Sequence, residues 1–268
     1  MDHSRERLTV LERKEISARH VHAALRLEGE EEIERSAAGL FWSAVACGMT
    51  LGLSMLAQGL LRHRLPDTWW RPLITSLGYA VGFIGLELGR QELYTGNTLT
   101  AILPALHHRR VDMLPRVGRV WAIVFAGNIV GTFIFAWAAA WTPAFSEPLK
   151  QAFVDLGREQ AAYSFATAFT KGIFGGWLIA LMIWLMPGAY HARIWVVAII
   201  TWCLSAAELT HVIAGSVDVL FAVMSGKLPF ATYVAHFALP VFLGNTAGSL
   251  VFVAALNHAQ VAVDEGPP

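Results

Sequence analysis

Gly89-Arg-Gln-Glu-Leu-Tyr-Thr-Gly-Asn-Thr98 stands where an apolar span of this chain should continue, and Thr210-His-Val-Ile-Ala-Gly-Ser216 does the same in a later span. Unwound backbone is tolerated at membrane depth only where it is buried in protein or lines a cavity. Two such breaks in corresponding spans are typical of transport proteins, which place their site near the bilayer midplane. The two segments therefore predict a pore between two broken helices.

The composition is that of a polytopic membrane protein. Of the 268 residues, 55% are apolar and 15% are charged, whereas a soluble domain carries about 25% charged residues. The 20 basic and 20 acidic residues balance, which argues against binding of nucleic acid through a bulk field. The composition also excludes a disordered regulator and a secreted disulfide scaffold. Cys47 and Cys203 lie in apolar runs, so we expect neither a bridge nor a metal site, and no cofactor.

Six apolar runs are long enough to cross a bilayer, which takes about 20 residues. They are residues 39–61, 73–89, 120–141, 164–186, 194–209 and 230–256. Six spans place both termini on one side, and twelve Lys and Arg on that side against six on the other predict cytoplasmic termini.

The chain divides into three parts. Residues 1–37 are predicted to form a charged cytoplasmic tail with a short helix, either amphipathic or simply solvated. Residues 38–258 form the predicted channel domain, and residues 259–268 a second cytoplasmic tail. The longest connection, residues 142–160, is expected to hold a short helix along the outer face.

An internal repeat is visible in the letters. A shift of 117 residues aligns Val124-Phe-Ala-Gly-Asn-Ile-Val-Gly-Thr132 with Val241-Phe-Leu-Gly-Asn-Thr-Ala-Gly-Ser249, and a shift of 116 pairs Glu92-Leu93 with Glu208-Leu209. Repeats at about 38–141 and 161–258 with three spans each must enter the membrane from opposite sides. The two Gly-xxx-Gly patterns within the aligned segments predict close helix packing around the pore.

Four segments resemble motifs of the formate/nitrite transporter family. Glu92-Leu-Tyr-Thr-Gly-Asn-Thr-Leu99 is similar to the loop that breaks the second helix of that family. Lys171-Gly-Ile-Phe-Gly-Gly-Trp-Leu178 resembles its fourth-helix lysine motif, His211-Val-Ile-Ala214 its fifth-helix histidine segment, and Pro240-Val-Phe-Leu-Gly-Asn-Thr-Ala-Gly248 its sixth-helix motif. The resemblance covers about residues 36–258. It implies a divergent member with an aquaporin-like, all-α, six-helix protomer, assembled as a homopentamer in the lipid bilayer of a bacterial inner membrane.

The resemblance also implies the site residues. The pore and substrate-binding residues are His211, Thr95, Asn245 and Lys171. The hydrophobic constrictions fall on Tyr79, Phe83, Tyr94 and Leu204. A charge network is expected from Glu208, Glu92, Glu87 and Arg90.

This sequence departs from the family's pattern next to the lysine and the histidine. The family usually has Glu before the histidine, whereas this chain has Thr210, and Gly215 and Gly176 replace two expected asparagines. A salt bridge of Lys171 to Glu208 or Glu92 is one alternative to a role in attracting anions. Arg90 and Glu87 are three residues apart on a helix, so we expect them to pair.

The leading hypothesis is a channel or transporter, not an enzyme, for small monovalent anions of weak acids such as formate or nitrite. A bare anion faces a desolvation cost of tens of kcal/mol in hydrocarbon, so it crosses more easily if it takes up a proton. His211 is suited to supply that proton, because histidine titrates near neutral pH. The two alternatives are a channel for small neutral solutes and a non-transporting scaffold whose charged tail binds a partner.

Overall fold

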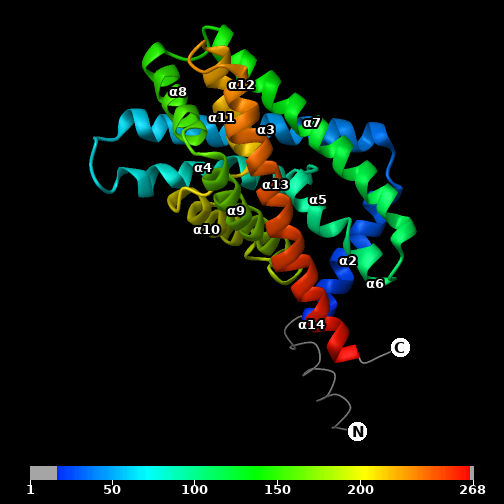
Figure 1. The fold of residues 1–268 in the computed structure, drawn as a ribbon. Helices are drawn as coiled ribbons and strands as arrows, with labels where there is room; N and C mark the ends of the chain where they lie inside the picture. The colour runs from blue at the N-terminus through cyan, green and yellow to red at the C-terminus, as the bar shows by residue number, and fades with distance from the viewer. Residues whose placement is uncertain (1–16, 266–268) are drawn as a thin grey trace.

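The computed structural model describes residues 17–265, and all regular structure in that part of the chain is helical (Figure 1). Within it, four helices are long and apolar enough to cross a membrane: Ala37–Arg64, Val111–Trp141, Phe165–Gly188 and Phe230–Gln260. Two shorter apolar helices, Arg193–Ala206 and Val212–Met224, lie between the third and the fourth.

The first half of the described chain contains α2 (Ala18–Glu34), α3 (Ala37–Arg64), α4 (Arg71–Leu88), α5 (Tyr94–Thr100), α6 (Leu103–His107) and α7 (Leu114–Trp141). The second half contains α8 (Glu147–Ala161), α9 (Phe165–Leu185), α10 (Arg193–Ala206), α11 (Val212–Met224), α12 (Phe230–Thr232), α13 (Leu239–Ser249) and α14 (Leu256–Glu265). The last three helices are joined by the π-helical turns Tyr233–Ala238 and Leu250–Ala255, so they form one bent rod (Figure 1).

Two pairs of long helices pack closely through glycine. α3 packs along α7, and α9 packs along α13. A Cβ atom added at Gly131 would overlap the carbonyl oxygen of Val45, and one at Gly248 would overlap that of Ile173. The expectation that the Gly-xxx-Gly segments allow close packing is confirmed, because only a residue without a Cβ permits this approach.

The chain unwinds at both predicted breaks. α4 ends at Leu88 and α5 begins at Tyr94, while α10 ends at Ala206 and α11 begins at Val212. Each break contains one residue in the left-handed region, Arg90 with φ 51° and Glu208 with φ 53°. Such a backbone is uncommon outside glycine, and it redirects the chain sharply. The runs 73–89 and 194–209 thus form α4 and α10, and beyond each break the chain continues in a separate short helix, α5 or α11.

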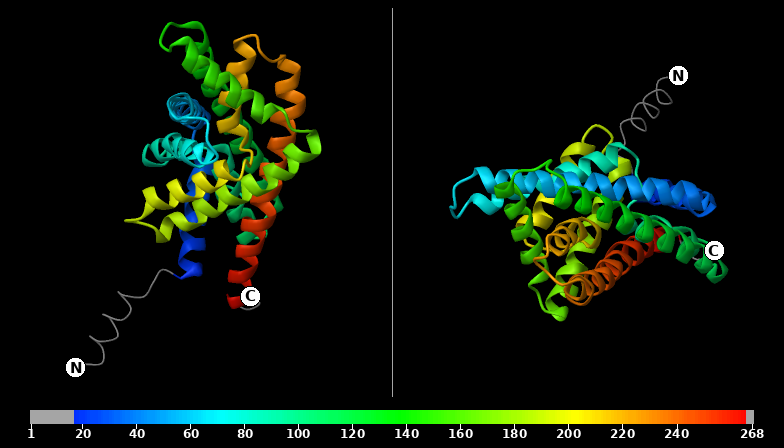
Figure 2. Two further views of the ribbon diagram at one scale, coloured as in Figure 1. Left: turned by 90° about the vertical axis from the view of Figure 1, so that its left-hand side faces the viewer. Right: turned by 90° about the horizontal axis from the view of Figure 1, so that it is seen from above.

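The two ends of the molecule differ. α2, α6 and α14 gather at one end, called the α2 end below, whereas α8 and α12 lie at the other (Figures 1 and 2). The helix expected near residues 142–160 is α8, and a helix within the predicted N-terminal tail is α2. Residues 1–16, which form the rest of that tail, lie outside the described residues. The last helix runs past residue 258 to Glu265, so the predicted C-terminal tail begins as helix.

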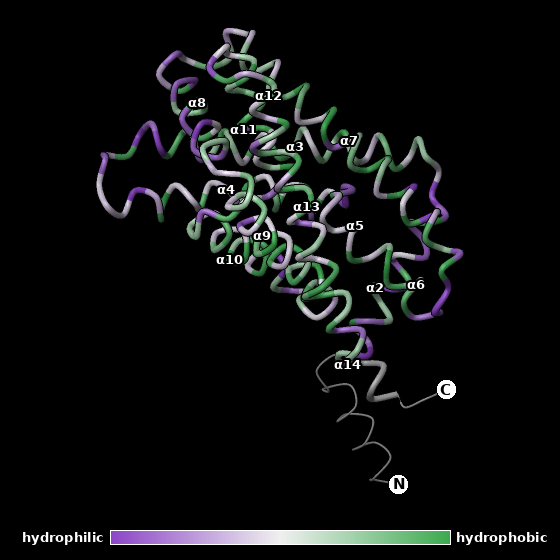
Figure 3. The backbone as a smooth tube through the Cα atoms, viewed as in Figure 1, coloured by the Kyte–Doolittle hydropathy of each residue, from purple (hydrophilic) through white to green (hydrophobic). Residues whose placement is uncertain are grey.

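Apolar side chains cover the outside of the helix bundle. Green, hydrophobic segments follow α7, α9 and α13 along their length, and purple segments concentrate near the helix ends (Figure 3). Large apolar residues exposed on these faces include Trp42, Phe133, Trp137, Trp141, Trp195 and Phe252. Such faces are stable only against lipid or another apolar protein surface.

Candidate functional site

Two buried asparagines hold the unwound segments in place. The Oδ1 of Asn128 accepts from the backbone N–H of Tyr94 at 2.9 Å, and its Nδ2 donates to the carbonyls of Ala44 and Glu92, both at 2.8 Å. Asn245 makes the equivalent hydrogen bonds at the second break, between α10 and α11. Its Oδ1 accepts from the N–H of Val212 at 2.8 Å, and its Nδ2 donates to the carbonyls of Gly172 and Thr210 at 2.8 and 3.0 Å.

These bonds correct one pairing made from the letters. The carbonyl that receives the amide proton of Asn128 belongs to Glu92, and the one that receives the proton of Asn245 belongs to Thr210. Thr210 is therefore the counterpart of Glu92, and the alignment of Glu92 with Glu208 is wrong by two residues. Sequence comparison could not detect this equivalence, because the two positions share a backbone hydrogen bond to a buried asparagine but carry different side chains.

Thr95 and His211 meet where the two breaks face each other. The Oγ1 of Thr95 lies 2.7 Å from the Nε2 of His211, and the side chains are 0% and 1% exposed. The backbone N–H of Ala214 donates to the Nδ1 of His211 at 3.1 Å. In the neutral imidazole the proton is then on Nε2, which donates to Thr95. The hydroxyl proton of Thr95 has no acceptor among the described residues, so it remains available as a hydrogen-bond donor.

The predicted constriction residues separate into two groups. The rings of Tyr79 and Phe83 lie 5.2 Å apart, and the ring of Phe83 lies 5.3 Å from that of His211. Tyr94 instead stacks on Phe242 at 5.2 Å and donates or accepts a hydrogen bond with Thr246 at 2.8 Å. Leu204 is fully buried in α10. Tyr79 and Phe83 thus lie beside the histidine, whereas Tyr94 packs against Phe242 and Thr246 of α13.

Lys171 is bound to the second break. Its Nζ donates to the backbone carbonyl of Glu208 at 2.9 Å and lies 3.6 Å from the carboxylate of the same residue. It also lies 4.6 Å from the centre of the Tyr163 ring. The salt bridge weighed from the sequence is present with Glu208, so much of the lysine's charge is already compensated.

The expected pair of Glu87 and Arg90 is not formed. α4 ends at Leu88 and Arg90 takes a left-handed conformation, so the helical spacing that would bring the two side chains together does not extend to residue 90. Within residues 17–265 neither side chain makes an ion pair. Glu92 pairs instead with Arg35 of α2 and accepts from the Nδ2 of Asn97 at 2.8 Å.

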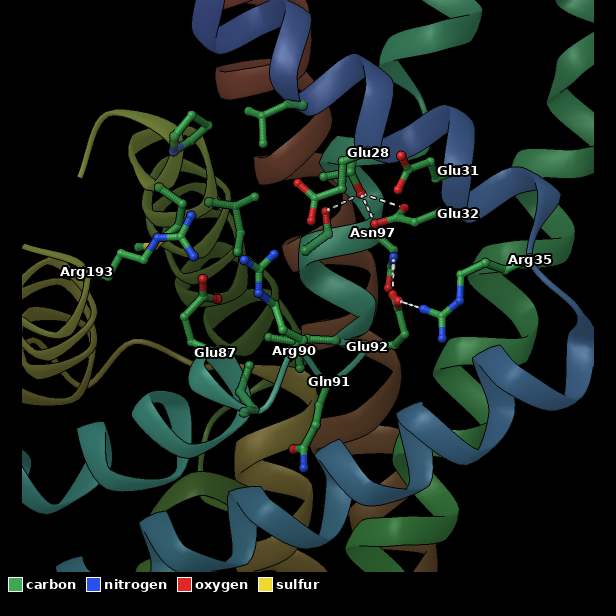
Figure 4. Close-up of a pocket in the computed structure, with 18 residues that line it drawn as sticks. Glu28, Glu31, Glu32, Arg35, Glu87, Arg90, Gln91, Glu92, Asn97 and Arg193 are labelled. Carbon is green, nitrogen blue, oxygen red and sulfur yellow. Dashed lines mark hydrogen bonds and ion pairs between the residues drawn. The ribbon is translucent and has the colours of Figure 1, made fainter. Parts of the chain in front are cut away.

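A cavity of about 260 Å³ opens at the α2 end, between α2, the first break and the ends of α9 and α10. Figure 4 shows its charged lining, with acidic side chains of α2 above and the Glu87 carboxyl between the guanidinium groups of Arg90 and Arg193. Leu93 and Gly96, on either side of Tyr94 and Thr95, also line it. The cavity therefore abuts the segment that carries Thr95.

Glu32 is the buried acid of this cavity. It is 7% exposed and accepts from the Oγ1 of Thr100 at 2.7 and 2.9 Å. Burial and the nearby Glu92 raise the pKa of Glu32 to about 8. Burial also raises the pKa of Glu28. Burial and the neighbouring negative charges therefore favour the protonated forms of Glu32 and Glu28.

Three of these residues were not found from the sequence. Glu32 and Arg193 lie at the ends of predicted spans, where charged residues are common, so nothing in the sequence distinguished them as site residues. Asp218 could have been recognised from the sequence, because it is the one acidic residue in the apolar run Val212–Met224. It is 2% exposed, and its Oδ1 has no hydrogen-bond partner in the described part of the chain. Acidic residues inside an apolar span are costly and commonly functional.

The chain is similar to known membrane transport proteins. The family described as formate/nitrite transporter matches residues 19–259. The chain is 38% identical over 244 residues to inner membrane protein YfdC of Escherichia coli K12, covering 91% of this chain and 79% of that protein. It is 26% identical over 225 residues to the nitrite transporter NirC of the same organism, with 80% of each chain covered.

Two solved structures share the fold. A pentameric formate channel with formate bound superimposes with a TM-score of 0.72 at 21% identity, covering 84% of this chain and 97% of that chain. A second channel, an FNT family ion channel, superimposes with a TM-score of 0.74 at 20% identity, covering 91% and 96%. At these identities the likeness shows the fold alone.

Proposed function

The chain belongs to the formate/nitrite transporter family, and we propose that it conducts small monovalent anions of weak acids, such as formate or nitrite, along a path past Thr95 and His211. The family is one of transporters and not of enzymes. The predicted membership is confirmed, whereas the substrate, the linkage to protons and the roles of individual residues form the proposal.

The hydrogen bond between Thr95 and His211 carries the proposal. The Nε2–H of His211 donates to Thr95, so the hydroxyl of Thr95 is polarised and its own proton is available to an anion. A carboxylate or nitrite that accepts a hydrogen bond from the Thr95 hydroxyl recovers part of the interaction energy that it lost when it left water. The aromatic rings of Tyr79 and Phe83 exclude water beside the same point.

Proton linkage follows from the same pair. A weak acid crosses an apolar constriction more easily as the neutral molecule. The anion takes the required proton from the solution outside the constriction, because the neutral imidazole would become an imidazolate if it gave up its Nε2 proton. His211 keeps that proton and, through its hydrogen bond to Thr95, orients the donor that the passing acid meets. Lys171 adds less positive potential than a free lysine, since Glu208 compensates it.

We further propose the architecture that the family resemblance implies. The protomer has six membrane helices in two inverted repeats, with α4–α5 and α10–α11 as the broken helices. The matching bonds of Asn128 and Asn245 support this symmetry. The pentameric formate channel that shares the fold supports a homopentamer. The inner membrane relative YfdC supports the same location, and we place both termini in the cytoplasm.

The test is solute flux through the reconstituted protein at pH 5 and pH 7. Formate, nitrite, acetate, hydrosulfide and the neutral controls urea and glycerol are offered to liposomes that contain the wild type or His211→Ala. We expect anion flux that rises at pH 5 and falls at least tenfold in His211→Ala, because the polarised donor is lost. Absence of flux of any anion at either pH from correctly assembled protein would refute the proposal.

One observation favours a second candidate, a channel for small neutral solutes. Lys171 is paired with Glu208, and among the described residues no free cation contacts His211. A pore whose charges are paired internally presents only hydrogen-bonding groups to the solute. In that case the same assay shows glycerol or urea flux without pH dependence, and little anion flux.

A further inference from the structure

The central pair leaves one buried acid of the apolar helices without a role. Asp218 is the one acidic residue of α11, and its side chain is 2% exposed. Its Oδ1 has no hydrogen-bond partner within residues 17–265. A carboxyl oxygen in the protein interior costs free energy unless a donor reaches it, so this atom indicates a missing proton or a missing ligand.

Asp218 belongs to the same line of contacts as the central pair. His211 caps the start of α11, and Asp218 follows about two helical turns, or about 10 Å, further along that helix. On the α4 side, the ring of Phe83 contacts His211, and the ring of Tyr79 lies 5.2 Å from that of Phe83. Tyr79 is close enough for the charge of Asp218 to act on it. The contacts therefore extend from His211 through the two rings to Asp218.

α8 contributes a second unpaired oxygen at this level. A Cβ atom added at Gly157 would overlap the backbone carbonyl of Asp218, so α8 and α11 touch there. Three residues further along α8, the Oε1 of Gln160 is buried and has no hydrogen-bond partner in the described part of the chain. Residues three apart share a helix face, so Gln160 lies on the face that α8 turns to α11. Two acceptors without donors on facing helices indicate a ligand that brings a proton.

Few charges surround Asp218. Besides α8, the main neighbours of α11 are α3, α7, α13 and the π-helical turn after α12. α13 has no titratable residue, and those of α7 lie in its first two turns. The π-helical turn contributes the phenol of Tyr233, while its His236 is exposed. Glu159 of α8 is close enough to act on Asp218, but Arg62 of α3 binds both of its oxygens at 2.6 and 2.8 Å. Among the described residues no cation pairs with Asp218.

We propose that Asp218 binds the conducted oxyanion through a proton, so that this point of the path accepts an anion and a proton together. The inference rests on the proposed function and assigns its coupling step to a residue beyond the central pair. Two acidic groups in contact hold one proton between them, because both cannot be ionised at that distance. The O–H of protonated Asp218 donates to an oxygen of the anion, whereas an ionised Asp218 repels it.

The proton that Asp218 carries comes from solution. When the solute moves toward Thr95 as the neutral acid, one O–H bond breaks at Asp218 and one forms on the solute, and Asp218 then takes up the next proton. His211 keeps its own proton throughout. While no anion is bound, the Oε1 of Gln160 offers an acceptor for the proton of Asp218. The ligand class is the oxyanion of a weak acid, since chloride, the anion of a strong acid, does not share a proton in this way.

The experiment measures formate binding to the detergent-solubilised protein between pH 5 and pH 9, from thermal stabilisation at each pH. Formate itself stays ionised over this range. We expect the half-saturating formate concentration of the wild type to rise by up to about tenfold per pH unit at the alkaline end, because one proton binds with each anion. In Asp218→Asn it should stay constant within about twofold, since the amide N–H replaces the O–H without titrating.

Two matched variants keep a carboxyl at position 218. Glu147→Gln removes an exposed carboxyl at the start of α8 and should show the pH dependence of the wild type. Asp218→Glu should show it as well, which separates loss of the titrating group from loss of folding. If the wild type binds formate in this way but conducts no anion in liposomes, the proposed function fails and the proton-sharing site stands. Equal pH dependence in the wild type and Asp218→Asn, or a wild-type affinity that stays constant up to pH 9, overturns the site.

Discussion

Single polar residues hold the centre of this molecule together. Asn128 and Asn245 are fully buried, and each satisfies one backbone donor and one backbone acceptor of its helix break and also bonds to a carbonyl of a neighbouring continuous helix. Unpaired backbone groups are costly away from water. An asparagine suits the task because its amide both accepts and donates.

Replacement of either asparagine should therefore destabilise the fold. We expect Asn128→Ala and Asn245→Ala each to lower the free energy of unfolding by about 2 kcal/mol, since each leaves one buried donor and one buried acceptor of the break unpaired at about 1 kcal/mol or more apiece. The measurement is unfolding of the detergent-solubilised protein. Asn257→Ala, at a partly exposed position without a hydrogen bond in the described structure, is the matched control. A loss no larger than that of the control would contradict the assigned role.

At the scale of elements, α2 is docked on the rest of the bundle. A Cβ at Gly29 would overlap the carbonyl of Thr100, so α2 lies directly against α5. Glu32 bonds to Thr100, and Arg35 pairs with Glu92 at the first break. Because α5 also carries Thr95, the position of α2 bears on the geometry of the central pair.

Docking of α2 should weaken as the pH rises. Docking raises the pKa of Glu32 from 4.5 to about 8, because of burial and the neighbouring Glu92 and Glu28. The docked form thus holds a proton that the free helix loses above pH 4.5. Docking is strongest below that pH and becomes less favourable by up to about 1.4 kcal/mol per pH unit until about pH 8.

Hydrogen-exchange protection of the α2 amides, corrected for intrinsic exchange, measures this effect. We expect protection to fall between pH 5 and pH 8 in the wild type and to stay constant in Glu32→Gln. Glu34→Gln, at an exposed position on the same helix, should behave as the wild type. Equal pH dependence in Glu32→Gln and Glu34→Gln would show that Glu32 is not the titrating group.

At the scale of the whole molecule, the apolar outer faces need a covering. About half or more of each of the four long apolar helices remains unburied within one chain. Lipid can cover these faces, and so can neighbouring copies.

We expect the purified protein to be a homopentamer. Native mass spectrometry from mild detergent should give about five times the chain mass of 29.3 kDa, because identical subunits that join through two different, mutually complementary apolar faces form closed rings. His211→Ala should give the same mass, since that residue lies inside one protomer. A monomer or another ring size under conditions that retain flux would refute the pentamer.

Local features could be predicted well from the amino-acid order. The two helix breaks, the close glycine contacts and the family were all found, because hydropathy and short motifs act over neighbouring residues. The family motifs named Thr95 and His211 among the pore residues, and the structure brings the two side chains together. The pairing of Glu87 with Arg90 was wrong, because helical spacing was assumed where the helix had already ended.

Amino-acid order therefore determined where this chain enters the apolar phase, where it unwinds, and which residue types stand at the breaks. The tertiary structure decided which charges meet: Lys171 with Glu208, Glu92 with Arg35, and Arg90 with Arg193 around one cavity. These partners are far apart in the chain or separated by a break. Coulomb interaction depends on distance in space, and that distance is set only when the helices pack.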